Sequence, residues 1–252
     1  MITSRRIQNG PAWLLHHRPF RDSSQILDIL SRDQGRLAVV SKGSRGAKSK
    51  LRGILRPFLP LQLSWFIRSD MGTLTGAEMD GAPLSLTGDA LLSGYYVNEL
   101  ILKLLHRHDP QPEIFAAYGR TIERLAGSKN VAPLLRQFEI ELLRILGYAL
   151  NLDHDTQTKE PLRPQQQYEY RVEQGPVPIS DREREGPMVF RGAELDAIRN
   201  QQFDDPAVLK NAGSLLRNVI AYHLDGKELK SRKVLMELRR ATDNQEVKEI
   251  ER

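Results

Sequence analysis

The chain of 252 residues contains no cysteine. This absence excludes disulfides, iron–sulfur clusters, thiol catalysis and cysteine-bound zinc. No run approaches the 18 consecutive apolar residues typical of a membrane helix, and the cations near the N-terminus have no apolar stretch behind them. We therefore expect neither a membrane span nor a signal peptide, and we expect a cytoplasmic protein.

Patterns that would indicate catalysis are also scarce. The histidines are scattered without an HxxxH or HExxH spacing, and no glycine-rich nucleotide-binding pattern is present. The Asp-His-Asp triplet at 153–155 and the Asp-Asp pair at 204–205 could hold the metal of a nuclease. However, the triplet lies in a polar loop, and the pair precedes Pro206 at a helix start, where acids favour the helix dipole. We predict no catalytic residue, no metal and no cofactor.

Positive charge is concentrated in the N-terminal part of the chain. Residues 1–80 hold 13 Lys and Arg against 6 Asp and Glu, whereas the remaining 172 residues hold 24 against 26. This asymmetry favours a nucleic-acid face on the first domain and protein partners for the rest.

The stretch at 34–69 carries eight cations and no acid. Its middle, SKGSRGAKSKLRG at 41–53, is rich in glycine and serine, which suit a chain segment that follows a ligand closely. Such a segment suits a polyanion, because Lys and Arg bind phosphates without a base preference. The alternative is a solvated loop that only aids solubility. The candidate phosphate contacts are Arg36, Lys42, Arg45, Lys48, Lys50, Arg52 and Arg56.

Short apolar runs predict five strands at 12–17, 24–31, 36–42, 59–67 and 73–79. Five short strands in about 70 residues suggest an OB-fold, the small barrel that binds single strands along one face and with its loops. The longest loop, between the third and fourth strands, is the basic one. Phe58, Trp65 and Phe66 could stack on bases or pack in the core, and strand alternation turns either Trp65 or Phe66 inward.

Beyond about residue 83 the pattern becomes helical, so the predicted class is α+β. Helices are predicted at 89–106, 112–126, 133–146, 193–200, 206–223 and 233–240. Alternation of Tyr168, Tyr170 and Val172 predicts either a hairpin with its turn near Gln174 and Gly175 or a partly ordered insertion. The expected domains are an OB-fold at 1–82, a helical domain at 83–150, an insertion at 151–190, a second helical part at 191–240 and a polar tail at 241–252.

Polar residues within the helical part carry two further expectations. Buried polar groups need partners, so Asn98 and Glu99 are expected to tie their helix to the barrel or to another helix. A second set of cations lies between residues 227 and 240. Three roles are possible for it: it extends a DNA-binding track, it docks a partner protein, or it is simply solvated. It comprises Lys227, Lys230, Arg232, Lys233, Arg239 and Arg240.

Four segments together resemble the RecO family of bacterial recombination mediators. They are SSQILDILSRDQGRLAVVSKGSRGAKSKLRGILRPF at 23–58, YYVNEL at 95–100, RQFEIELLRILGY at 136–148 and DGKELKSR at 225–232. The resemblance implies an OB-fold, a helical domain and a small insertion. It also implies binding of single- and double-stranded DNA, strand annealing, and loading of RecA together with RecR. Other implied features are contact with the acidic C-terminal tail of single-stranded-DNA-binding protein, association with the nucleoid and no catalytic step. Many family members hold zinc with four cysteines in the insertion, which this chain lacks.

Arg136 is the candidate contact for that acidic tail. On the predicted helix it shares a side with Ile140 and Leu143, so that a cation borders an apolar strip. A guanidinium can hold a terminal carboxylate through two hydrogen bonds, and an apolar groove can take the last side chain. The alternative is that Arg136 pairs with Glu139 while Ile140 and Leu143 belong to the core. A nuclease and an RNA-binding OB-fold module remain the alternative functions.

Overall fold

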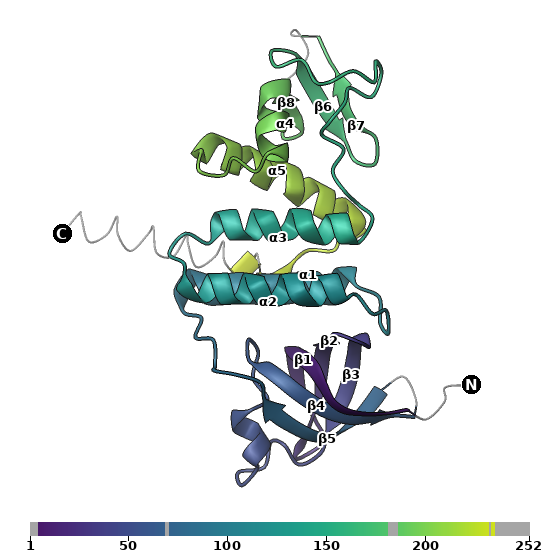
Figure 1. Cartoon of the computed structure of the whole chain (residues 1–252), viewed down its shortest axis with the longest axis vertical. Helices are drawn as coiled ribbons and strands as arrows, with labels where there is room; N and C mark the ends of the chain where they lie inside the picture. The colour runs from purple at the N-terminus through teal and green to yellow at the C-terminus, as the bar shows by residue number, and fades with distance from the viewer. Residues whose placement is uncertain (1–4, 69–70, 181–185, 232, 235–252) are drawn as a thin grey trace, which may run out of the picture. The chain divides into compact units, whose positions relative to one another are not determined.

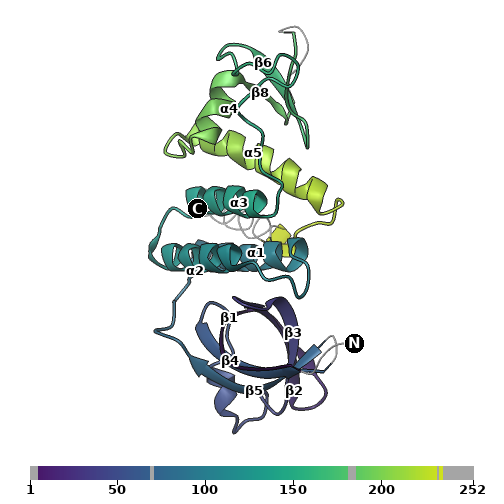
Figure 2. The ribbon, with the colours of Figure 1, turned by 45° about the vertical axis from the view of Figure 1, so that its right-hand side comes forward.

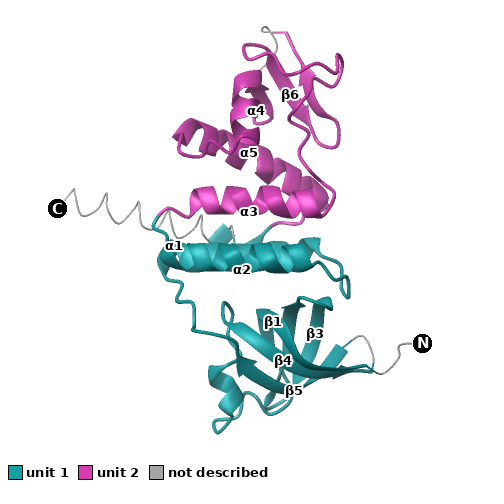
Figure 3. Ribbon diagram, viewed as in Figure 1, with its two compact units in different colours: residues 1–129, 229–252 teal, residues 130–228 magenta. Residues whose placement is uncertain are grey.

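A computed structural model describes residues 5–68, 71–180, 186–231 and 233–234 (Figure 1). The chain forms two compact units, one of residues 1–129 with 229–252 and one of residues 130–228 (Figure 3). Whether the boundaries expected near 82, 150 and 190 delimit independent domains stays a prediction. In the described part, no helix combines the length and the apolar character needed to cross a membrane.

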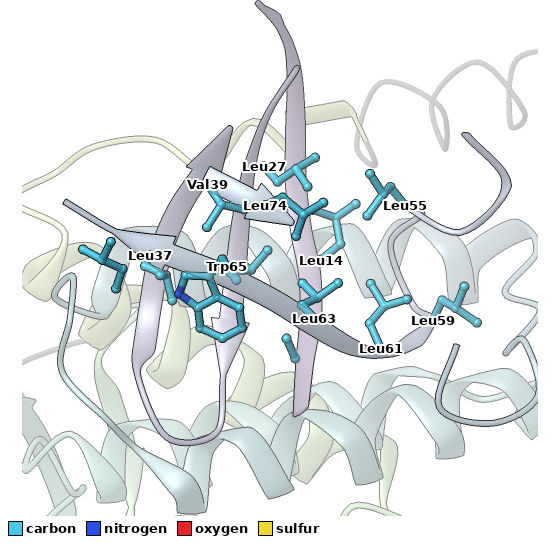
Figure 4. Close-up of a cluster of buried hydrophobic side chains, with 13 residues drawn as sticks. Leu14, Leu27, Leu37, Val39, Leu55, Leu59, Leu61, Leu63, Trp65 and Leu74 are labelled. Carbon is cyan, nitrogen blue, oxygen red and sulfur yellow. The ribbon is translucent and has the colours of Figure 1, made fainter. Parts of the chain in front are cut away.

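The N-terminal part of the first unit is a closed five-stranded barrel in the order β1-β2-β3-β5-β4. Its strands are β1 (Arg5–Phe20), β2 (Ser24–Ser31), β3 (Gly35–Ser41), β4 (Pro60–Ile67) and β5 (Met71–Met79). Only the β3–β5 pair is parallel. In β4 the residues alternate between buried and partly exposed, which turns Leu63 and Trp65 into the core (Figure 4). The five-stranded OB-fold barrel expected from the sequence is confirmed.

A short 3-10 helix at Lys50–Gly53 lies within the stretch of eight cations at 34–69, which we call the basic stretch. Leu51 and Ile54 pack against the barrel core, and Leu55 and Leu59 belong to it (Figure 4). The basic stretch is therefore held to the barrel by apolar contacts and is not a freely solvated loop. The spacing of Leu51, Ile54 and Leu55 at i, i+3 and i+4 was the sequence signal for this turn of helix.

Two helices of the same unit, α1 (Gly88–Leu104) and α2 (Pro112–Gly127), lie against the barrel (Figure 2). Asn98 joins them to β1, because its side-chain N–H donates to the carbonyl of Leu15 at 2.8 Å. The Tyr118 hydroxyl on α2 donates to the side-chain carbonyl oxygen of Asn98, also at 2.8 Å. Burial of Tyr118 raises the pKa of its hydroxyl well above the ordinary value. The expected tie through Asn98 is confirmed.

Glu99, the next residue of α1, binds the chain segment that returns to this unit. Its carboxylate accepts the backbone N–H groups of Lys230 and Ser231 and the Ser231 hydroxyl at 2.6–2.9 Å. Burial raises the pKa of Glu99, but these hydrogen bonds and the nearby charge of Lys103 outweigh it, so the pKa lies below its usual value. The expected role of Glu99 is confirmed. Beyond residue 234, the predicted helix at 233–240 and the tail at 241–252 lie outside the described residues.

The described residues of the second unit, 130–180 and 186–228, form three helices and a small sheet. The helices are α3 (Ala132–Ile145), α4 (Gly192–Arg199) and α5 (Pro206–His223), and the strands are β6 (Gln167–Arg171), β7 (Gly175–Pro178) and β8 (Val189–Arg191). The β6–β7 hairpin confirms the predicted turn, whereas β8 was missed because three residues are too few for a pattern. Asp205 accepts the N–H of Ala207 and caps α5, which confirms its helix-start role.

The insertion contains a buried carboxylate, that of Asp155. Asp155 accepts the backbone N–H groups of Gln157 and Thr158 at 2.7 and 3.2 Å, and its own N–H donates to the carbonyl of Glu160. The Thr156 hydroxyl donates to the carbonyl of Pro176 and joins this turn to β7. Asp153 pairs with Arg199. These contacts give both acids of the 153–155 triplet a structural role.

Candidate nucleic-acid interface

The β1–β2 turn and the basic stretch lie at the same end of the barrel. Strand pairing sets Phe20 opposite Ser24 and Gln25 opposite Ser41, so β1 and β3 end where β2 begins. We call residues 20–24 and 42–59 together the loop end.

Six of the seven candidate cations lie at the loop end with exposed side chains. They are Lys42, Arg45, Lys48, Lys50, Arg52 and Arg56, and we call them the loop cations. Because Leu51 and Leu55 hold this segment to the core, the cations are displayed on an ordered surface. A preformed surface loses less conformational entropy on binding than a disordered loop does.

Arg45 also joins the two parts of the loop end. Its backbone N–H donates to the carbonyl of Ser23 at 2.9 Å, and its guanidinium donates to the carbonyls of Arg21 and Asp22 at 3.3 and 3.5 Å. Gly43 has φ +68°, a left-handed conformation that glycine adopts at little cost. The β1–β2 turn and the loop cations therefore form one continuous surface.

Arg36, the seventh candidate, lies apart from this surface. It is half-buried on β3, and its Nε donates to the carbonyl of Leu105 at the end of α1 at 3.0 Å. Burial and the neighbouring charge of Arg107 lower the pKa of its guanidinium. The structure thus gives Arg36 a role in joining barrel and helices, and its contribution to a ligand site stays a prediction.

The aromatic candidates differ in exposure. Trp65 is fully buried in the barrel core, and Phe58 is 5% exposed and packs edge-on against Tyr95 at 5.2 Å. Neither ring can present a face to a base. Phe66 is half-buried with the Arg68 guanidinium 5.1 Å from its ring centroid. Sequence reasoning overlooked Phe20, although it lies between two arginines at a hairpin turn, in the run Arg-Pro-Phe-Arg at 18–21.

The helices of the first unit pack against β1, and the residues just after α1 contact β2 and β3. Trp13 on β1 packs against Tyr118 of α2 with ring centroids 5.2 Å apart, and Asp28 on β2 pairs with Arg107. OB-folds commonly bind nucleic acid across strands 2 and 3. In this chain the helices lie beside the barrel (Figure 2), and β2 and β3 contact the residues just after α1 through Asp28–Arg107 and Arg36–Leu105. The loop end carries the exposed cations.

Arg136 on α3, in the second unit, forms an ion pair with Glu139 at 2.7 Å. Its side chain is 17% exposed and that of Glu139 is 1% exposed. Leu143 has no exposed surface, whereas Ile140 is partly exposed. The expectation that Leu143 lines a groove therefore needs correction, because helix packing places that side chain in the core.

The second cationic set is only partly described. The side chains of Lys227, Lys230 and Lys233 are exposed. Arg232, Arg239 and Arg240 lie outside the described residues.

Comparison with known proteins covers both halves of the chain. The family described as "Recombination protein O N terminal" matches residues 6–81, and "Recombination protein O C terminal" matches residues 85–233. A relative from Nitrosococcus oceani is 41% identical over 235 residues, which are 93% of this chain and 95% of the relative. A relative from Nitrosospira multiformis is 37% identical, covering 94% of this chain and 98% of the relative. One from an Azoarcus species is 41% identical, covering 94% and 99%. All three are named "DNA repair protein RecO".

Proposed function

The chain belongs to the RecO family of DNA repair proteins, and from that premise we propose that it is a non-catalytic mediator of recombination. It binds single- and double-stranded DNA, anneals complementary strands and, together with RecR, helps RecA to load onto strands coated by single-stranded-DNA-binding protein. It acts in the cytoplasm at the nucleoid.

The observation that carries this proposal is the set of six exposed loop cations on an ordered segment without acids. Lysine and arginine side chains bind phosphates and leave base edges untouched. A strand held by its backbone keeps its bases available for pairing, which an annealing protein requires. Binding through phosphates is also indifferent to sequence, as repair at arbitrary sites demands.

DNA affinity is expected to fall steeply with salt. If about four to seven phosphates are neutralised, the logarithm of the binding constant for single strands should change with log salt with a slope of about −3 to −5. Fluorescence anisotropy titrations from low to high salt measure this slope. A flat dependence would contradict binding by the loop cations.

The mediator activity itself is tested with complementary labelled strands coated by single-stranded-DNA-binding protein. Adding this protein should accelerate their annealing. Running the same reaction with magnesium separates the nuclease alternative, which predicts shortened strands. Competition by an RNA strand of matched sequence separates the RNA-binding alternative, which predicts that RNA displaces DNA at equal concentration.

We further propose that the second unit binds the acidic tail of single-stranded-DNA-binding protein at Arg136 and Ile140. One guanidinium nitrogen of Arg136 pairs with Glu139, and the other terminal nitrogen lies near Gly213 on α5. An additional carboxylate at this cation would gain from charge and hydrogen bonding. The exposed Lys227, Lys230 and Lys233 are proposed to extend the DNA track or to dock RecR.

Arg136→Lys is expected to weaken binding of a peptide with the acidic tail sequence by about tenfold, because lysine keeps the charge but lacks the planar fork. Binding to bare DNA should be unchanged. Peptide and DNA titrations on the same preparation measure both. Arg136→Ala is the poorer test, because it removes the ion-pair partner of the buried Glu139. Equal peptide affinity in Arg136→Lys and the parent would place the site elsewhere.

A further inference from the structure

Phe20 is an aromatic side chain at the edge of the loop end. It closes β1 opposite Ser24, and its side chain is half-buried. The guanidinium carbon of the exposed Arg21 lies 5.2 Å from its ring centroid, within cation–π distance. Arg21 itself has φ +53°, a left-handed backbone that is uncommon for residues other than glycine.

This turn is fixed next to the loop cations. Arg45 donates both a backbone and side-chain hydrogen bonds to carbonyls of the turn at residues 21–23. A phosphate held by the loop cations would therefore carry its nucleotide close to the Phe20 ring. The other aromatic side chains considered for stacking do not share this position, because Trp65 and Phe58 are buried and Phe66 lies near the opposite end of β4.

We propose that Phe20 is a stacking platform for one unpaired base of a bound single strand, a role that rests on the proposed DNA binding. In the unbound protein the Arg21 guanidinium covers the ring. When a strand binds, a phosphate attracts this exposed cation, and a base takes its place against the phenyl group. Stacking on aromatic side chains tolerates any base, because every base has a π face.

The consequence is a preference for single strands at the loop end. A base within a duplex is already stacked between its neighbours, so it cannot also lie on Phe20 without being unstacked. The loop cations bind the backbone of either form, whereas Phe20 adds affinity only for a strand with free bases.

The test compares Phe20→Leu with the parent on three ligands: a thymidine strand of about 16 nucleotides, an abasic strand of equal length and a duplex. Leucine keeps the apolar bulk at the strand end but lacks a π face. Affinity for the thymidine strand should fall about 5- to 150-fold, as loss of one stacked base predicts. The affinity of Phe20→Leu for the abasic strand and for the duplex should stay close to that of the parent. Phe20→Tyr, which keeps an aromatic ring, should bind the thymidine strand as tightly as the parent does.

Phe66→Leu is the matched control, because Phe66 is also half-buried beside an arginine but lies away from the loop end. Its affinity for all three ligands should match that of the parent. Unchanged thymidine-strand binding in Phe20→Leu, an equal loss on the abasic strand or an equal loss in Phe66→Leu would overturn the stacking role while leaving DNA binding intact. Absence of DNA binding by the parent would overturn the proposed function as well.

Discussion

Reversing Lys48, Lys50 and Arg52 to Glu is expected to weaken binding of single-stranded DNA on the order of 100-fold at physiological salt. Each lost phosphate contact on a single strand lowers the salt slope by about 0.7, so three losses should lower it by about 2. The added carboxylates then repel the backbone. The three side chains are exposed, so the barrel should stay folded. Arg45 is left unchanged because it also holds the β1–β2 turn.

The control reverses three exposed lysines outside the barrel, Lys129, Lys159 and Lys210. Both triple variants change the net charge equally, so a general electrostatic effect would weaken them alike. We expect the control to bind nearly as the parent does, with an unchanged salt slope. Circular dichroism shows whether each variant is folded. Equal losses in the two folded variants would mean that the loop cations do not form the interface.

Replacing Asn98 by Ala is expected to lower the free energy of unfolding of the first unit by about 2–5 kcal/mol. The substitution removes the hydrogen bonds that the Asn98 side chain makes with two groups from other elements, the carbonyl of Leu15 and the buried hydroxyl of Tyr118. Both tryptophans of the chain, Trp13 and Trp65, lie in this unit. Their fluorescence during urea unfolding therefore measures the unit in question.

Two control variants separate the joining role of Asn98 from the loss of any buried polar group. Tyr118→Phe removes one of the two hydrogen bonds and should cost about 1–2 kcal/mol. Thr121→Val removes a hydroxyl that bonds only to the carbonyl of Ala117 in its own helix, and it should cost less than about 1 kcal/mol. If Asn98→Ala costs no more than Thr121→Val, the link between barrel and helices is energetically unimportant.

The sequence pattern by itself determined the order and type of most of the secondary structure, although it missed β8 and the 3-10 helix at Lys50–Gly53. Alternation in PLQLSWFI gave β4, and Pro206 after Asp205 gave the start of α5. These signals are local, because a strand or helix repeats over neighbouring residues and is ended by turn or capping residues within a few positions. The four quoted segments taken together were likewise enough to indicate the family, and the residues at 34–69 to indicate the basic stretch.

Only the tertiary structure decided which side chains are accessible. Alternation required Trp65 or Phe66 to point inward, and barrel closure made Trp65 the buried one. The helices pack against β1 through contacts such as the Asn98–Leu15 hydrogen bond, which joins residues 83 positions apart. Burial of Leu143 and the position of Phe20 beside the loop cations depend on the same kind of distant contact. Exposure is set by what packs against a residue from elsewhere in the chain, and no local repeat in the sequence carries that information.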